Sequence, residues 1–76
     1  MKMNELFSVG DMVFGYCNGF FDRDDYDDKV CVLVNSKYAV FQYTEGRWKG
    51  FAAVLNYTDS LSKEMVDSWK IEKTEY

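Results

Sequence analysis

The sequence lacks histidine and proline, and it has only two cysteines among its 76 residues. Without histidine the chain has no common general base, no common metal ligand and no conventional partner for a serine or cysteine nucleophile, so a catalytic triad is excluded. Without proline it has no cis-proline turn and no polyproline recognition segment. We therefore expect a protein that is not an enzyme.

The two cysteines, Cys17 and Cys31, are too few for the disulfide framework of a small secreted protein. They form no CxxC motif, which argues against a zinc site and against a thioredoxin-like site. No apolar run approaches the roughly 20 residues of a membrane-spanning helix, and residues 1–8 lack a signal-peptide pattern. We expect two buried free thiols in a cytoplasmic protein that does not insert into membranes.

Charge of one sign is concentrated in a single segment. The net charge is −4, and residues 22–28 contain five aspartates and one arginine, so the remaining 8 acidic and 8 basic residues cancel. General binding to the phosphates of nucleic acid is disfavoured because it needs a basic field. A protein partner with a basic surface is favoured instead.

Hydrophobic and aromatic residues are abundant, at 47% and 18% of the chain. This composition is typical of a folded domain, because each buried aromatic ring removes a large area from water. The length is near the lower limit for a self-sufficient core, so we expect one domain over residues 1–76. Residues 1–6 are expected to be a loose lead-in.

Three strands separated by turn signals are predicted between residues 29 and 55. They cover residues 29–34, 37–44 and 48–55, with turns at Asn35-Ser36 and at residues 45–47. The first strand has apolar residues on both faces, so we expect it to be central and covered on each side. The pattern predicts a β-meander.

The first half of the chain predicts shorter strands. Residues 12–16 alternate as a strand after Gly10, and Asn18-Gly19 is a strong hairpin signal. Phe20-Phe21 is expected to begin a short return strand. Residues 22–28 are predicted to be a loop, because aspartate is depleted in strands and adjacent like charges repel.

After residue 56 the pattern becomes helical. A stripe at helical spacing follows a loop that ends in capping residues, and its members are Leu61, Met65, Val66 and Trp69. One interpretation extends this helix to about Lys70. The other ends it near Asp67 and continues with a strand over residues 68–73, and we prefer the second because residues 69–74 alternate.

The opening Phe7-Ser-Val-Gly-Asp-Met-Val13, with the short strands, the meander and the final helical turn, resembles small SH3-like barrels such as Tudor and KOW-type modules. It is also similar to small uncharacterised proteins of tailed bacteriophages with a comparable Gly-Asp-x-Val turn. The resemblance implies a mainly-β barrel of about five strands with a short C-terminal helical element. It further implies binding through loops and one exposed face, and a phage origin implies interference with a host or defence protein.

Calcium binding is the one metal hypothesis that the acidic segment suggests. Asp22, Asp24 and Asp28 match ligand spacings of an EF-hand loop, but Asp27 stands where the loop needs glycine and Leu33 where it needs glutamate. We expect no metal site and no cofactor.

The candidate partner-binding residues lie in the acidic segment and in the turn before the third strand. They are Asp22, Asp24, Asp25, Tyr26, Asp27, Asp28, Arg47 and Trp48. The acidic segment is either a solubilising loop or a contact surface that mimics nucleic-acid phosphates, and the aromatic residues beside it favour contact. Arg47-Trp48 is either a hot-spot pair or a turn arginine covering a half-buried tryptophan.

These features predict a small acidic, soluble protein-binding module. In its most specific form it is a phage-encoded inhibitor that presents its acidic loop to a host or defence protein. The first alternative is a barrel that binds single-stranded nucleic acid through exposed aromatic rings. The second is a purely structural or assembly role. The sequence does not indicate an oligomeric state.

Overall fold

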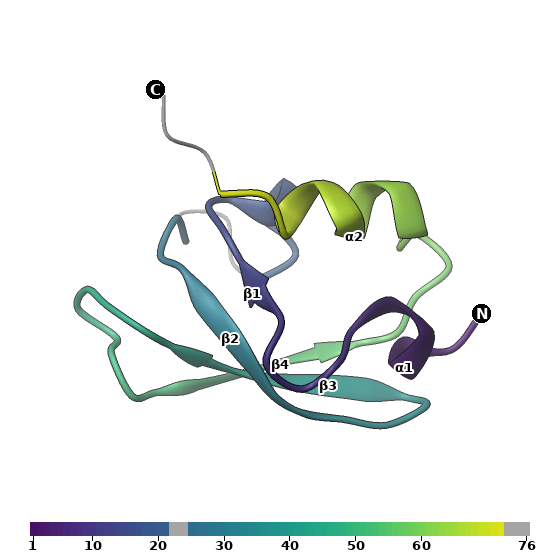
Figure 1. Ribbon diagram of the computed structural model, residues 1–76, viewed down its shortest axis with the longest axis horizontal. Helices are drawn as coiled ribbons and strands as arrows, with labels where there is room; N and C mark the ends of the chain where they lie inside the picture. The colour runs from purple at the N-terminus through teal and green to yellow at the C-terminus, as the bar shows by residue number, and fades with distance from the viewer. Residues whose placement is uncertain (22–24, 73–76) are drawn as a thin grey trace.

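The computed structural model describes residues 1–21 and 25–72. In chain order its elements are α1 (Met3–Leu6), β1 (Met12–Val13), the 3-10 turn η1 (Cys17–Gly19), β2 (Lys29–Val34), β3 (Tyr38–Tyr43), β4 (Ala52–Asn56) and α2 (Lys63–Trp69). The strands form one antiparallel sheet in the order β1-β2-β3-β4. Helix α2 lies over one face of this sheet, and α1 lies below the start of α2, beside the turn that joins β2 and β3 (Figure 1).

The predicted meander is confirmed, since β2, β3 and β4 are consecutive neighbours in the sheet. The last strand begins at Ala52 rather than at Trp48. The cause is a longer connection over residues 44–51, in which Gly46 and Gly50 have left-handed φ angles of +79° and +87°. Gly50 N–H donates to the Tyr43 carbonyl, and Tyr43 N–H donates to the Phe51 carbonyl, which closes the loop.

The fold is mainly β with a short C-terminal helix, as expected, but the sheet is open. Within the described residues it has four strands, and β1 and β4 are its two edges rather than partners. The two-residue β1 is too short to extend the sheet round to β4. Closure into a barrel of about five strands is therefore not seen.

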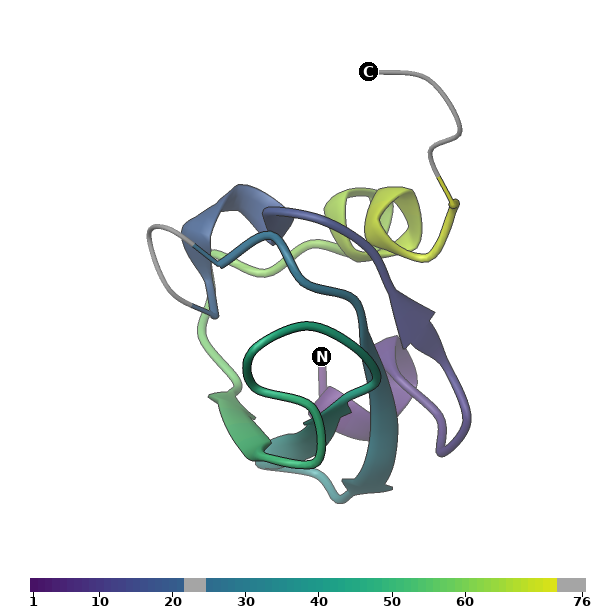
Figure 2. The same ribbon diagram turned by 90° about the vertical axis from the view of Figure 1, so that its left-hand side faces the viewer.

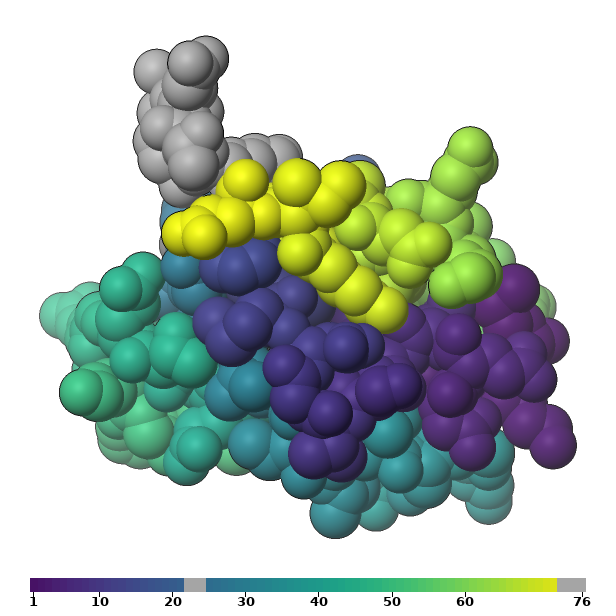
Figure 3. Space-filling model, viewed as in Figure 1, coloured from purple at the N-terminus to yellow at the C-terminus, as the bar shows by residue number. Residues whose placement is uncertain are grey.

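The preferred prediction of a strand over residues 68–73 is wrong for its described part, residues 68–72, and the longer helix is the correct alternative. Helix α2 continues to Trp69, with the hydroxyl of Ser62 accepting from Met65 N–H at its start. Helical spacing places Val66 and Trp69 on the buried face together. This packing outweighs the alternation that favoured a strand, and Figure 3 shows α2 seated on the first part of the chain.

The predicted hairpin at Asn18-Gly19 is also wrong. The turn η1 stands there, with Cys17 and Asn18 at φ angles of +51° and +53°, and Phe20-Phe21 forms no strand. The indole Nε1–H of Trp69 donates to Asn18 Oδ1 at 2.7 Å. The Asn18 side chain therefore serves a contact with the C-terminal helix instead of a hairpin.

The first six residues are not a loose lead-in, because two of them, Met3 and Leu6, belong to the core. Met3 and Leu6 of α1 are buried, and Met3 N–H donates to the Ser36 carbonyl of the β2–β3 turn at 3.1 Å. The side chain of Lys70 donates to the Leu6 carbonyl at 2.6 Å. The N-terminal turn is thus attached at both ends of the fold.

The hydrophobic core lies between the sheet and the helices. Its members are Met3, Leu6, Phe7, Val13, Cys17, Cys31, Ala39, Phe41, Leu55, Leu61, Val66 and Trp69. Both cysteines are buried and form no disulfide with each other, as expected, and burial raises the pKa of the Cys31 thiol, which keeps it protonated at neutral pH.

The opposite face of the sheet is uncovered, contrary to the expectation that β2 is covered on both sides. β2 is internal in the sheet, but a bulge between Cys31 and Leu33 leaves Val32 and Leu33 exposed. Within residues 1–21 and 25–72, no helix has the length and apolar character needed to cross a bilayer.

Leu6→Ala tests whether the N-terminal turn is structural. Removing this buried side chain should lower the free energy of unfolding by about 3 kcal/mol, measured by urea denaturation. Val9→Ala removes an exposed side chain nearby and should change it by less than about 0.5 kcal/mol. Equal small effects of both variants would mean that residues 1–6 contribute nothing to the core.

Candidate functional site

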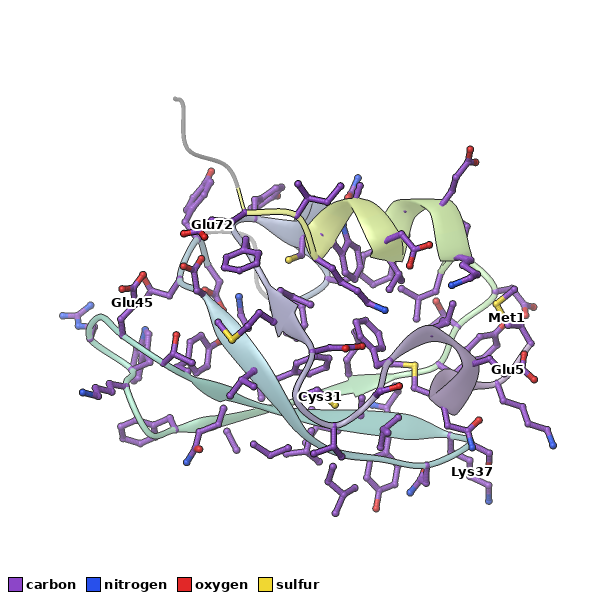
Figure 4. All side chains as sticks on the ribbon, in the orientation of Figure 1. Met1, Glu5, Cys31, Lys37, Glu45 and Glu72 are labelled. Carbon is purple, nitrogen blue, oxygen red and sulfur yellow. The ribbon has the colours of Figure 1, made fainter. Side chains whose placement is uncertain are left out.

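A pocket opens at one end of the sheet, between residues 25–28 and the loop 44–51. Its lining residues are Phe21, Asp25, Tyr43, Arg47, Trp48, Phe51 and Ala52, and its volume is about 450 Å³. Figure 2 faces the loop 44–51 end-on, and Figure 4 places Glu45 of this loop at the end of the sheet opposite Lys37. The volume is within the range of small-ligand and side-chain pockets.

The pocket brings together residues that the sequence analysis singled out in separate segments. Asp25 comes from the acidic segment, while Arg47 and Trp48 come from the loop before β4. Asp22 and Asp24 lie outside the described residues. Three of the candidates, Asp25, Arg47 and Trp48, thus line one concave surface. Phe21, Tyr43 and Phe51 add three rings that were not singled out as site residues.

The outer wall of the pocket is made of exposed aromatic rings. Trp48 is 48% exposed and Phe51 60% exposed, and their rings meet edge to face at a centroid distance of 5.6 Å. The Arg47 guanidinium lies 5.7 Å from the centre of the Trp48 ring. The arginine packs against a half-exposed tryptophan, as in the second of the two predicted alternatives, and the hot-spot pair stays a prediction.

Behind the inner wall lies Lys29, a buried charge that the sequence analysis missed and that contacts the lining residues Phe21, Asp25 and Tyr43. Its side chain is fully buried, and its Nζ donates to the Asp27 carbonyl at 2.6 Å and lies 3.5 Å from Asp25 Oδ1. The same ammonium lies 4.5 Å and 5.3 Å from the ring centres of Phe21 and Tyr43. A buried ammonium must be paired and hydrogen-bonded to be tolerated, so these groups are held in place around it.

Asp25 is held from three directions. One carboxylate oxygen accepts from the Tyr43 hydroxyl, and the other faces Lys29 and accepts from Asp27 N–H at 3.1 Å. The Asp25 side chain is only 7% exposed. Its charge is therefore offset within the protein, and it contributes a fixed acceptor to the pocket rather than a free surface charge.

The rest of the described acidic segment is fastened to the loop 44–51. The Asp28 carbonyl accepts from Thr44 N–H at 3.1 Å and from the Thr44 hydroxyl at 3.2 Å. The carboxylate of Asp27 lies against Gly46, where a Cβ would stand 2.7 Å from Asp27 Oδ2. Glycine at position 46 thus permits both the left-handed φ angle and the close approach of the Asp27 carboxylate.

Tyr26 points away from this arrangement. It is exposed, and its ring stacks on Tyr16 at a centroid distance of 5.2 Å. Of the candidate residues in the described part of the acidic segment, Tyr26 is the most exposed. It forms a second small aromatic surface outside the pocket lining.

The chemistry of the pocket is that of binding. In the described part of the chain no group of His, Cys, Asp or Glu residues is arranged to hold a metal ion. Every buried side-chain nitrogen and oxygen there has a hydrogen-bond partner. Four aromatic rings, one fixed carboxylate and one guanidinium provide apolar, cation–π and hydrogen-bonding contacts.

Comparisons with protein-family models, with curated proteins and with solved structures gave no match. The geometry of the pocket and its surroundings is therefore the basis for a functional proposal.

Asp25→Asn should destabilise the fold, because it removes the carboxylate that offsets the buried charge of Lys29. We expect a loss of about 3 kcal/mol in the free energy of unfolding, measured by urea denaturation. Lys29→Met replaces the ammonium by an apolar side chain of similar length, and in this background Asp25→Asn should cost much less. Equal costs of Asp25→Asn in the two backgrounds would show that the two side chains do not interact.

Proposed function

We propose that this protein is a small protein-binding module whose pocket takes a basic side chain from a partner with a basic surface. The observation that carries the proposal is the joining of exposed aromatic rings with a fixed carboxylate in one pocket. Trp48 and Phe51 are exposed, and Asp25 lies beside them in the same lining. The faces of exposed aromatic rings attract a cation, and Asp25, whose charge is offset by Lys29, contributes a fixed hydrogen-bond acceptor beside them.

Arg47 supports the choice of a cation. Its guanidinium already lies over the Trp48 ring. A partner's arginine would make the same kind of contact with a part of the aromatic wall that Arg47 leaves exposed. Trp and Arg are also the residue types that dominate binding energies at interfaces. The candidate contact surface is therefore centred on Arg47 and Trp48, with the described part of the acidic segment, residues 25–28, beside it.

The more specific proposal is a phage-encoded inhibitor of a host or defence protein. It rests on the resemblance of residues 7–13 and of the strand layout to SH3-like barrels and to small phage proteins. In that setting the acidic segment imitates nucleic-acid phosphates on a basic host surface.

Small cationic probes test the pocket directly. N-acetyl-arginine amide should shift the indole N–H resonance of Trp48 in a two-dimensional NMR titration, and the citrulline analogue, which has the same shape without the charge, should shift it much less. Trp48→Ala should remove the chemical-shift changes that the arginine probe causes at Phe51 and Tyr43. Ile71→Ala, which removes an exposed apolar side chain outside the pocket lining, should leave them unchanged.

Equal shifts with arginine and citrulline probes would contradict the preference for a cation. Unchanged binding by Trp48→Ala would contradict the pocket itself. Asp28→Asn is the suitable variant for testing the charge of the acidic segment, because its main chain still accepts from Thr44. The matched substitution at Asp25 is unsuitable, since it would disturb Lys29.

Single-stranded nucleic-acid binding is the second candidate, and one observation favours it. Trp48 and Phe51 present exposed rings beside two exposed cations, Arg47 and Lys49, which is the combination that stacks bases and contacts phosphates. A short oligothymidine should then quench Trp48 fluorescence, more weakly as salt is raised. Fluorescence and electrophoretic mobility that do not change would rule this function out.

A further inference from the structure

Strand β4 forms an unpaired edge of the sheet within the described residues. Tyr57 N–H donates to the Lys37 carbonyl, and Tyr43 N–H donates to the Phe51 carbonyl. In an antiparallel pair the direction of the main-chain groups alternates along the strand. The N–H and C=O groups of Ala52, Val54 and Asn56 therefore point outward, away from β3.

This edge lacks the features that usually prevent strand pairing. The sequence of β4, Ala-Ala-Val-Leu-Asn, contains no charge and no proline, and its register with β3 runs without a bulge. Val54, at the middle of the strand, is 57% exposed. Natural edge strands are commonly protected by charged residues, proline, bulges or short length. The other edge strand, β1, is protected by its short length of two residues.

We propose that β4 pairs with β4 of a second copy of this chain, antiparallel and centred on Val54. In this register Val54 faces Val54 of the second copy, and Ala52 faces Asn56 of the second copy. Each outward-pointing residue of the strand then exchanges both main-chain hydrogen bonds. If the register shifted by one residue, outward-pointing main-chain groups of one copy would face residues of the other copy whose groups point inward. A shift by two residues would leave one outward-pointing residue of each strand unpaired.

The residues that flank β4 are complementary in the same register. Phe51, which is 60% exposed, faces Tyr57 of the second copy, and aromatic pairs across strands are stabilising. The exposed Arg47 and Lys49 precede β4, while the exposed Asp59 follows it. Antiparallel pairing brings the basic start of one strand to the acidic end of the other, whereas parallel pairing would bring like charges together.

The contact made by one five-residue strand is small beside the roughly 1,200 Å² that stable interfaces bury at the least. We therefore expect a reversible dimer whose population rises with protein concentration. The two-fold axis through Val54 makes the contact isologous, so pairing ends at two copies through this edge. This dimer goes beyond the pocket proposal and does not depend on it.

Sedimentation equilibrium of the full chain over a concentration series tests the proposal. The unmodified protein should show a monomer–dimer equilibrium. Val54→Lys should abolish the dimer, because it places two ammonium groups opposite each other at the axis. Leu33→Lys is the matched control: it adds the same charge to the same sheet face, in the row Leu33–Val40–Val54, but away from the edge, and it should leave the dimer unchanged.

A pair of charge variants keeps the test decisive if Val54→Lys affects folding. Lys49→Asp and Asp59→Lys each alter an exposed residue, and each should weaken the dimer, while the two combined should restore it. A protein that is monomeric at every concentration overturns the proposal. A dimer that survives Val54→Lys also overturns it. So does a dimer that Leu33→Lys abolishes, because that result would indicate packing through the sheet face. A dimer that the combined charge variant fails to restore overturns it as well. The cationic-probe titration of the pocket remains interpretable in each of these cases when it is read at Trp48 and Tyr43, because Phe51 also lies in the proposed dimer contact.

Discussion

The burial of the Lys29 ammonium is the constraint on which the pocket end of this molecule depends. An ammonium removed from water needs hydrogen bonds and an opposing charge nearby. Lys29 obtains them from the Asp27 carbonyl and the Asp25 carboxylate, with the rings of Phe21 and Tyr43 completing its surroundings. These partners draw the end of the acidic segment inward onto the loop 44–51. The pocket is the space left between the two.

Because of this arrangement, part of the chain's negative charge is engaged within the protein. The acidic segment accounts for the whole net charge of −4, yet Asp25 is engaged internally and Asp27 lies against Gly46. This end of the described structure presents the exposed rings of Trp48 and Phe51 beside a carboxylate that is already paired. If this end is an interface, as we propose, its binding energy would come mainly from the rings, and the charges would guide approach and orientation.

Alternation and turn signals were sufficient to predict the meander, because β2, β3 and β4 follow one another with one face buried. They were insufficient wherever a distant residue decides the local structure. Asn18-Gly19 has the composition of a hairpin, but the Asn18 side chain is bound by the Trp69 indole. Residues 1–6 have no long pattern of their own, and their burial depends on the β2–β3 turn and on Lys70.

For the candidate site, the sequence indicated individual residues but not their arrangement in space. Arg47 and Trp48 stood out as a charged and aromatic pair, and Asp25 as part of the acidic segment, but nothing local indicates that they share a pocket. Lys29 was read as the polar first residue of a strand, because a fully buried lysine is rare. Its position directly after a run of aspartates is the one signal in the sequence that could have suggested a paired and buried charge.

The contacts of Trp69 determine when this chain can fold during its synthesis. Its indole and main chain bind Asn18 and Phe14, and its ring packs on Phe7, Phe20 and Phe21. The core therefore joins the two ends of the sequence, and it stays incomplete until residue 69 has been made and has left the ribosome. Folding is expected only once residue 69 has left the ribosome, and until then the aromatic residues before residue 22 are exposed to solvent and to chaperones.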